Sequence, residues 1–389
     1  MCDACGAGDG NRNTDWAWEM EGREMKYAQV AIIGGGPAGL AAAIEIARGG
    51  GQATVMDENH RPGGQLFKQI HKFFGSHEHQ AGVRGYAIGE QLLKETSEMG
   101  VDVMLNTSVY GIFDNFKIGY IEQKREQLLQ AERIILAAGA SENTLALPNG
   151  TLPGVMGAGA AQTMINVHRV LPGRKIIMVG SGNVGLIVSY QLLQAGADVV
   201  ALLEAAPEIG GYGVHASKIR RTGVPILTSH TIKEVVGKCQ VEGVIVVELD
   251  GSMAQKPGSE QFIEADTVCI AVGLNPLTEL AWLAGCEFVY IPVLGGNVPR
   301  HDTNMETTVK GLYVAGDISG VEEASSALDE GRLAGIACAE SLGLYSSGEA
   351  RQLKAAVWDR LDSLRTGPFG QKRKDAKDKL ISTGEGSVL

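Results

Sequence analysis

Short apolar runs alternate with amphipathic stretches along the 389-residue chain, and two parts of it repeat one order. Residues 28–33 (AQVAII) predict a buried strand, residues 40–48 a helix, and residues 53–56 (ATVM) a second strand. From residue 175 the order recurs, with KIIMV as strand, VGLIVSYQLLQAG as helix and DVVALLE as strand. Each set has the pattern of a βαβ unit, so an α/β fold with parallel strands is predicted.

A glycine-rich turn with G-x-G-x-x-G spacing joins strand to helix in both units. The first turn holds Gly34, Gly36 and Gly39, and the second holds Gly180, Gly182 and Gly185. In such a turn the first glycine permits a tight bend, the second lets a diphosphate approach the backbone, and the third lets the helix pack on the strand. The free N–H groups at the helix start favour an anion. Two such turns predict two bound dinucleotides.

A carboxylate ends the second strand of each unit. Asp57, with Glu58 beside it, follows the first unit, and Glu204 ends the second. A carboxylate at this place accepts hydrogen bonds from ribose hydroxyls and repels a 2′-phosphate. The second unit is therefore predicted to prefer NAD(H) to NADP(H). We interpret Arg220 and Arg221 as an exposed helix face, with an arginine pair that binds phosphate as the alternative.

Composition and charge narrow the classes of partner. The chain is 44% apolar and 20% charged, and its formal net charge of −11 argues against binding nucleic acid. Residues 1–26 are polar and acidic, so we expect a disordered leader, no signal peptide and no membrane insertion in a cytoplasmic protein. Cys2 and Cys5 in this leader form a CxxC without a second pair. It is interpreted as part of a tail, with a ligand pair completed by another chain as the alternative.

Three further strand ends complete a recognisable set. GLYVAGDI at 311–318 ends in Gly316 and Asp317, while RIILAAGA at 133–140 and DTVCIAVG at 266–273 end in small residues. With the two glycine turns, they make the chain similar to the two-dinucleotide flavoproteins, the pyridine nucleotide-disulfide oxidoreductases, over about residues 28–343. The resemblance implies that the first turn binds FAD, that Asp317 holds its ribityl and phosphate part, and that the second turn binds NAD(H).

The motifs and this resemblance give two sets of candidate cofactor-binding residues. The FAD set is Gly34, Gly36, Pro37, Ala38, Gly39, Asp57, Glu58, Gly64, Gln65, Leu66, Ala138, Gly139, Gly316, Asp317, Ala324 and Ser325. The NAD(H) set is Gly180, Gly182, Asn183, Val184, Gly185, Glu204 and Gly273. The two sets imply hydride transfer between a nicotinamide and a flavin.

The expected fold class is α/β, with two Rossmann-like, three-layer (ββα) dinucleotide-binding domains. The NAD(H) domain, residues 151–274, is expected to be inserted into a discontinuous FAD domain made of residues 27–150 and 275–343. Residues 344–389 are expected to be a C-terminal helix and a polar tail. The helix is predicted at about 349–364, with Leu353, Val357, Leu361 and Leu364 on one side, and residues 371–389 are predicted to be solvated.

The chain lacks the redox cysteine pair of the disulfide reductases in this superfamily, so disulfide reduction is not expected. Residues 151–165 (TLPGVMGAGAAQTMI) and 210–228 resemble the dinucleotide-binding subunits of heteromeric amino-acid dehydrogenases of the opine oxidase, hydroxyproline dehydrogenase and hydrogen cyanide synthase type. This implies an oligomer that acts on a small-molecule substrate, and the expected partner is a sister flavoprotein or iron–sulfur subunit. A stand-alone NADH-dependent reductase of a small acceptor or ferredoxin is the alternative, and a nucleotide-binding protein without turnover is a third.

Histidines are dense in the loop after Gly64-Gln65-Leu66. His71, His77 and His79 are weak catalytic candidates, as contacts for flavin, substrate or partner, or as a proton donor. Surface residues without a role are the equal alternative. Tyr212 and His215 are candidates to lie near the nicotinamide. No metal site is predicted, because no helical HxxxH or carboxylate companion accompanies these histidines.

Overall fold

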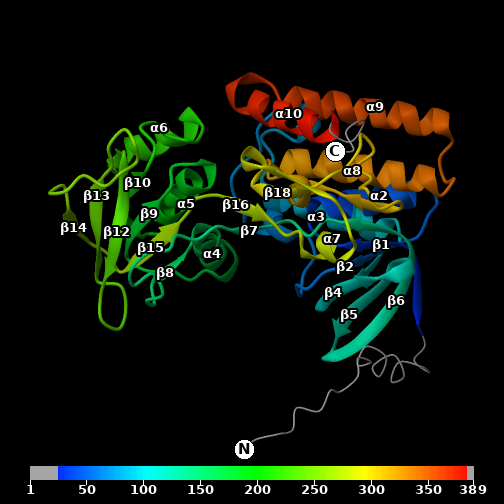
Figure 1. The fold of residues 1–389 in the computed structure, drawn as a ribbon, viewed down its shortest axis with the longest axis horizontal. Helices are drawn as coiled ribbons and strands as arrows, with labels where there is room; N and C mark the ends of the chain where they lie inside the picture. Colours follow the sequence, from blue (N-terminus) through cyan, green and yellow to red (C-terminus); the bar gives the residue numbers. More distant parts are fainter. Residues whose placement is uncertain (1–24, 383–389) are drawn as a thin grey trace, which may run out of the picture.

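The computed structural model describes residues 25–382, which form two α/β lobes joined by a pair of extended segments (Figure 1). These segments, β7 (Ala140–Glu142) and β16 (Leu274–Pro276), pair in antiparallel fashion, so the chain leaves the first lobe and returns to it side by side. The first lobe is therefore made from the two ends of the chain and the second from its middle. Cys2 and Cys5 of the expected leader lie outside the described residues.

The first lobe is built on a seven-stranded sheet. Five strands run parallel in the order β3–β2–β1–β6–β19, with bounds Asp102–Met104, Ala53–Met56, Lys26–Ile33, Arg125–Leu136 and Leu312–Val314. Strand β19 follows the second lobe in sequence, yet its Leu312 lies opposite Ile134 of β6. The α/β fold class expected from the sequence is confirmed, with one lobe inserted into the other.

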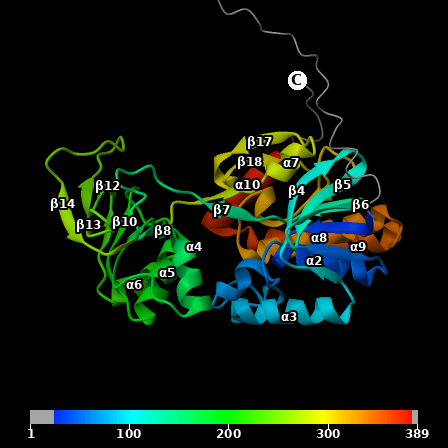
Figure 2. The same cartoon turned by 90° about the horizontal axis from the view of Figure 1, so that it is seen from below.

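Two different layers cover the faces of the five parallel strands (Figure 2). Helices α2 (Pro37–Arg48), α3 (Gly85–Glu98) and α8 (Ala324–Ser341) lie on one face. An antiparallel meander, which continues from β6 through β5 (Lys117–Glu122) to β4 (Thr107–Phe113), lies on the other. Along β1, Val30 and Ile32 pack with helix residues, whereas Ala31 and Ile33 pack with meander residues. This alternation is the period of two of a β-strand, and it produces the predicted three layers.

Helices α2 and α8 pack closely because glycines of α8 face small residues of α2. A Cβ added to Gly331 would lie 2.2 Å from the carbonyl oxygen of Ala38, and one added to Gly335 would lie 2.6 Å from that of Ala42. Backbone thus meets backbone along the contact, and any larger side chain would push the helices apart. This contact fixes the start of α8 relative to the first glycine turn.

The second lobe repeats the three layers on a five-stranded parallel sheet. The strand order is β11–β10–β9–β15–β8, with bounds Ile226–Thr228, Asp198–Glu204, Lys175–Val179, Thr267–Ile270 and Val155–Gly157. One core joins the sheet to α4 (Ala158–Thr163), α5 (Asn183–Gln194) and α6 (Gly213–Arg221). A second core joins it to an antiparallel sheet of β12 (His230–Val236), β13 (Gly243–Glu248) and β14 (Gln261–Glu264). A π-helical turn, Met164–His168, continues α4.

Shorter elements connect these layers. After β16 come α7 (Glu279–Leu283) and the hairpin of β17 (Phe288–Ile291) and β18 (Gly296–Pro299). Single 3₁₀ turns occupy Gly64–Lys68, His77–His79, Asp114–Phe116, Pro292–Leu294 and Gly316–Ser319. The first and last of these turns bear on the candidate site, because they carry Gly64 and Gly316.

The C-terminal region corrects the prediction of a polar tail. Helix α9 (Ser347–Leu364) is followed by a second helix, α10 (Gly367–Ser382), which occupies residues predicted to be solvated. Ala376, Lys377 and Leu380 of α10 are buried against the first lobe. The lysine-rich sequence is typical of an exposed tail, but here one lysine finds buried hydrogen-bond acceptors, which only the folded first lobe supplies.

The buried face of helix α9 agrees in part with the apolar side predicted from the sequence. Val357 and Leu361 are buried, whereas Leu353 is 38% exposed, and Ala350 joins the buried face instead. A capping box between Ser346 and Glu349 fixes the start of the helix.

Within residues 25–382, no helix is long and apolar enough to cross a membrane. The same range contains no group of three His, Cys, Asp or Glu side chains that could hold a metal ion.

Candidate functional site: two equivalent glycine turns

The first glycine turn links β1 to α2 at the carboxyl edge of the sheet. Gly34 has φ +108°, and a Cβ added there would lie 2.2 Å from the carbonyl oxygen of Ala137. A Cβ added to Gly39 would lie 1.9 Å from the carbonyl oxygen of Gly34, so both positions exclude a side chain. A Cβ added to Gly36 would meet nothing within 4 Å. Its surroundings are therefore open at the point where the helix begins.

Asp57 anchors this turn. Its Oδ2 accepts a hydrogen bond from the backbone N–H of Gly35 (2.6 Å), and its Oδ1 accepts from the backbone and side-chain nitrogens of Asn59 (2.8 Å each). A carboxylate has about four acceptor positions, so one of them stays free for a ribose hydroxyl. Asp57 is 6% exposed, whereas Glu58 beside it is exposed. The sequence-predicted carboxylate thus also has a structural role.

Other members of the predicted FAD set meet at the same turn. A Cβ added to Gly64 would lie 2.9 Å from Cα of Gly36, and one added to Gly316 would lie 2.9 Å from Cβ of Ala38. Ala138 lies behind the turn, with its nitrogen 3.2 Å from an added Cβ on Gly34. Segments distant in sequence therefore converge at the start of α2. The side chain of Leu66 is fully buried in the core and leaves only its backbone for a ligand.

Asp317 stands beside this convergence with an unusual protonation equilibrium. Burial raises the pKa of Asp317 to about 6, and the hydrogen bond from the backbone of Glu322 and the nearby Lys377 oppose that rise only in part. The N–H of Glu322 lies 3.4 Å from Oδ1. Near pH 6 the carboxyl group can thus be a donor or an acceptor, which suits contact with hydroxyl groups.

The second glycine turn, between β9 and α5, reproduces the geometry of the first. Gly180 has φ +102°, and an added Cβ would lie 2.2 Å from the carbonyl oxygen of Ala271. A Cβ on Gly185 would lie 2.0 Å from the carbonyl oxygen of Gly180, and one on Gly182 would meet nothing within 4 Å. Val184 in the first turn of α5 is 41% exposed. Two turns from distant parts of the chain therefore have the same backbone geometry. Each leaves open space over its middle glycine, which we call the cradle.

Glu204 holds the second turn as Asp57 holds the first. Its Oε2 accepts hydrogen bonds from the backbone N–H (2.9 Å) and the hydroxyl (2.5 Å) of Ser181, and its Oε1 accepts from the N–H of Ala206 (2.9 Å). Three of about four acceptor positions are again used. Gly273 lies at the far side, where its carbonyl oxygen accepts from the N–H of Asn143. Arg220 and Arg221 are exposed residues at the end of α6, as interpreted from the sequence.

Both turns fit the diphosphate of a dinucleotide. Each has open space over its middle glycine, unpaired N–H groups at the start of a helix of twelve residues, and a carboxylate with one free acceptor position. Ala324 and Ser325 begin a third helix, α8, beside the first turn. Each turn thus presents the donors and acceptors that the diphosphate and a ribose of a dinucleotide require.

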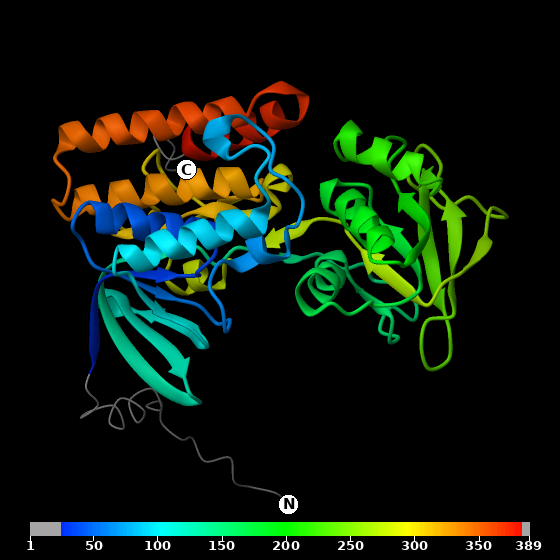
Figure 3. The same ribbon diagram turned by 180° about the vertical axis from the view of Figure 1, so that it is seen from behind.

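The three histidines have three different surroundings. His77 is exposed, and His79 is buried, with its ring bonded to Ser76 and to the carbonyl oxygen of Arg360 in α9. Figure 3 shows the loop, in blue, beside the orange and red C-terminal helices. His79 is therefore a structural residue. Burial lowers the pKa of His71 to about 4, with His215 and Lys218 adding to the effect, and its Nδ1 has no partner in the described part of the chain.

His71 belongs to a contact between the two lobes. Phe74 of the same loop packs its ring edge-on against those of His215 (5.3 Å between centroids) and Tyr212 (6.3 Å) at the start of α6. Tyr212 and His215, predicted to lie near the nicotinamide, face the histidine-rich loop in this arrangement. The loop thus packs against the helix that follows the second βαβ unit.

Sequence reasoning missed Ser181 and the two cations of the C-terminal helices, Arg365 and Lys377. Ser181 stands between the glycines of the second turn, where a serine resembles any small turn residue. Arg365 and Lys377 lie beyond the recognised motifs.

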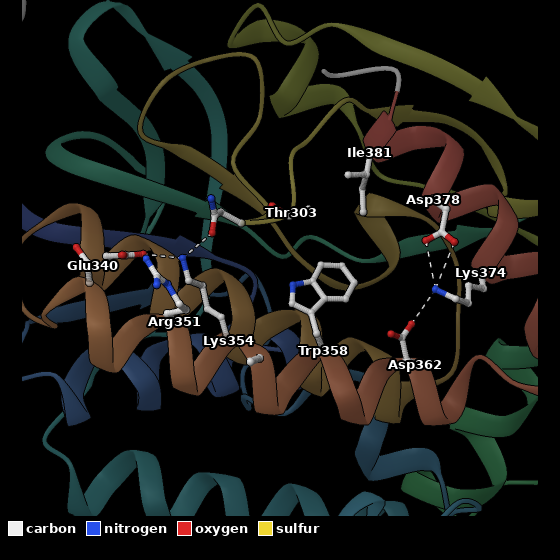
Figure 4. Close-up of a pocket in the computed structure, with 12 residues that line it drawn as sticks. Thr303, Glu340, Arg351, Lys354, Trp358, Asp362, Lys374, Asp378 and Ile381 are labelled. Carbon is white, nitrogen blue, oxygen red and sulfur yellow. Dashed lines mark hydrogen bonds and ion pairs between the residues drawn. The ribbon is translucent and has the colours of Figure 1, made fainter. Parts of the chain in front are cut away.

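A cleft of about 760 Å³ lies on the C-terminal helices, where Trp358 points inward (Figure 4). No site residue predicted from the sequence lines this cleft.

Two linked lobes, each with a carboxylate-anchored glycine turn, define a protein with two dinucleotide-binding folds. The chain belongs to the pyridine nucleotide-disulphide oxidoreductase family, whose model matches residues 28–331. Members of this family use FAD and NAD(P)H. The solved structure of T. acidophilum thioredoxin reductase superposes with a TM-score of 0.68 at 20% identity, covering 82% of this chain and 99% of that one. The fold and the family expected from the sequence are confirmed.

Two curated relatives are components of larger enzymes. An opine oxidase subunit of Rhizobium meliloti is 30% identical over 82% of this chain and 64% of its own length. The hydrogen cyanide synthase subunit HcnB of Pseudomonas aeruginosa is 26% identical over 88% of this chain and 77% of its own length. The chain thus spans somewhat less than two thirds of the opine oxidase relative. Their similarity confirms the narrower resemblance noted in the sequence.

Proposed function

We propose that the protein is an FAD-dependent oxidoreductase that transfers hydride or electrons between NAD(H) and a second substrate or partner. We further propose that it works as one component of an amine or amino-acid dehydrogenase complex. The observation that carries this proposal is the pair of equivalent turns, in which Asp57 and Glu204 each hold the backbone N–H after the first glycine. One protein with two such sites is suited to join two redox cofactors.

The residues of the chain would bind and orient the two cofactors. In the first lobe, the start of α2 and the open space over Gly36 receive the diphosphate, while Asp57 and Asp317 take hydroxyl groups. In the second lobe, Glu204 takes ribose hydroxyls and disfavours a 2′-phosphate, so NAD(H) is the proposed nucleotide. Bound FAD would supply the exchange of hydride with the nicotinamide.

The cysteines favour redox chemistry without a protein disulfide. The four cysteines of residues 25–382 are free, and burial raises the pKa of Cys269 and Cys338 to about 12. Such thiols stay protonated near neutral pH and are poor nucleophiles. This supports a small molecule or a partner protein, rather than an internal disulfide, as the group that exchanges electrons with the flavin besides NAD(H).

The names of the relatives support an amine as the ultimate substrate. In the direction of amine oxidation, a CH–NH group loses a hydride and a proton and becomes an imine. The hydride, with its two electrons, reduces NAD⁺ to NADH or an equivalent carrier of a partner, and the proton passes to solvent. A sister protein of the complex would supply the amine site, since two nucleotides would occupy the proposed sites on this chain.

Anaerobic stopped-flow absorbance tests the proposal. The purified protein is mixed with NADH, with NADPH, and with candidate amino acids, alone and after co-expression with neighbouring genes. We expect flavin bleaching with NADH in the isolated chain, and bleaching with an amino acid only in the co-purified complex. A homo-oligomer that oxidises NADH rapidly with a small acceptor would favour the stand-alone reductase, and purified protein without a flavin spectrum would contradict both.

A further inference from the structure

A buried cluster of four charged side chains lies beneath the Gly316–Asp317 turn. Glu330 of α8 accepts hydrogen bonds at Oε1 from Lys377 Nζ and from Arg365 Nη2, each over 2.7 Å. Arg365 also donates to both carboxylate oxygens of Glu322, from Nε to Oε1 (3.1 Å) and from Nη2 to Oε2 (2.6 Å). All four side chains are at most 4% exposed. Two cations and two carboxylates therefore neutralise one another inside the protein.

The two cations come from the C-terminal helices, and the two carboxylates come from the nucleotide-binding lobe. Lys377 lies in α10 and Arg365 directly follows α9, whereas Glu322 precedes α8 and Glu330 lies in the second turn of α8. Burial alone would raise the pKa of Glu330, but Lys377 and Arg365 outweigh it and lower the pKa. Because a buried charge without its partner is strongly unfavourable, loss of either cation must disturb the carboxylates.

Hydrogen bonds join this cluster to the turn. Oε2 of Glu330 accepts from the N–H of Gly316 (3.1 Å) and from the hydroxyl of Ser319 (2.9 Å). Lys377 donates to the carbonyl oxygen and the hydroxyl oxygen of Ser319, each at 2.9 Å. Gly316 and Ser319, on either side of Asp317, are thus both hydrogen-bonded to Glu330, and Ser319 is bonded to Lys377 as well.

We propose that Lys377 and Arg365 are positioning residues for FAD, through which the C-terminal helices hold the Gly316–Glu322 segment in the shape that receives the cofactor. This inference rests on the proposed function, because it assumes that FAD binds at the first glycine turn. A Cβ added to Gly316 would lie 2.9 Å from Cβ of Ala38 at the start of α2, so a displaced turn would narrow the space over the first glycine turn. His301 faces the cluster as a neutral side chain, since burial lowers its pKa to about 4.

Replacement of Lys377 by methionine tests this role, with Lys374→Met as the matched control. Lys374 lies one turn away on α10 and is also ion-paired, to Asp362 and Asp378, but at the surface (Figure 4). The measurements are flavin per chain as purified, the FAD dissociation constant of the deflavinated protein, the visible flavin spectrum, and NADH binding. We expect at least tenfold weaker FAD binding and an altered flavin spectrum in Lys377→Met, with NADH binding unchanged. The control should match the wild type in all four.

Two further variants keep the test decisive if Lys377→Met folds poorly. Ser319→Ala removes only a hydroxyl and should weaken FAD binding about threefold. The double variant Lys377→Met/Glu330→Gln leaves no unpaired buried charge, so it should regain thermal stability but not the wild-type FAD affinity. Folded variants that bind FAD as the wild type does, with the same spectrum, overturn this inference alone. A wild-type protein that binds no FAD overturns the proposed function as well.

Discussion

The side chain of Asn183 donates a hydrogen bond over 3.1 Å to Oε1 of Glu323 and so joins the second glycine turn to the residue that precedes helix α8. Asn183 also accepts from the N–H of Tyr212 through its Oδ1 (2.9 Å). One residue of the predicted NAD(H) set therefore contacts both its own lobe and the lobe assigned to FAD. The relative placement of the two sites depends in part on this polar contact.

Substitution of Glu323 is predicted to loosen the two lobes without unfolding either. Glu323 is exposed, so Glu323→Ala should lower the free energy of unfolding by less than about 1 kcal/mol. Small-angle X-ray scattering should show a larger radius of gyration than in the wild type. Glu264→Ala removes an exposed ion pair with Lys175 inside the second lobe and is the control. Equal radii in all three proteins would contradict the prediction.

Two glycines of the first turn should respond in opposite ways to a side chain. Gly36 has open space and an extended backbone conformation (φ −77°), so Gly36→Val should keep the thermal stability of the flavin-free protein while it abolishes FAD binding. At Gly39 an added Cβ would lie 1.9 Å from a carbonyl oxygen, so Gly39→Ala should destabilise the fold by about 3 kcal/mol. Urea unfolding and FAD titration separate the two effects. Full FAD binding by Gly36→Val would refute the assignment of the cradle.

Loss of Glu204 is predicted to weaken NADH binding and to relax the choice between nucleotides. Glu204→Ala removes a charged acceptor, and hydrogen bonds to such groups contribute about 1.5–3 kcal/mol, so the NADH dissociation constant should rise about 10–100-fold. The change should be smaller for NADPH, whose 2′-phosphate no longer meets a carboxylate. Fluorescence titration measures both constants, and FAD content is the internal control. An unchanged NADH affinity would mean that the adenosine end of NADH binds away from Glu204.

Asp317 should make the stability of the flavin-free protein depend on pH. Burial raises its pKa from the ordinary 3.8 to about 6, so the folded state holds this proton between about pH 4 and 6 while the unfolded chain releases it. The contribution of the group is therefore full below about pH 4 and is lost as the pH rises through 6. At pH 7.5, Asp317→Asn should exceed the wild type by about 3 kcal/mol in urea unfolding, with little difference at pH 4. An equal difference in unfolding free energy between the variant and the wild type at both pH values would refute this prediction.

Recognition of the glycine turns from sequence succeeded because their chemistry is local. Gly34, Gly36 and Gly39 lie within six residues, and the backbone of such a turn is determined by which positions lack a Cβ. The histidine-rich loop gave no comparable signal. His77 and His79 are neighbours in sequence, yet one is exposed and the other bonds to Arg360, because a distant helix supplies the partner.

By itself the sequence determined the α/β class, the two glycine turns with a carboxylate at the end of the next strand, and the family. Each of these depends on residues close together in the chain, where strand period, turn geometry and helix start leave few alternatives. Only the tertiary structure decided that the C-terminal segment is a packed helix and that Lys377 is buried against Glu330. A lysine is buried only where acceptors from other parts of the chain surround it, and their meeting is a property of the whole fold.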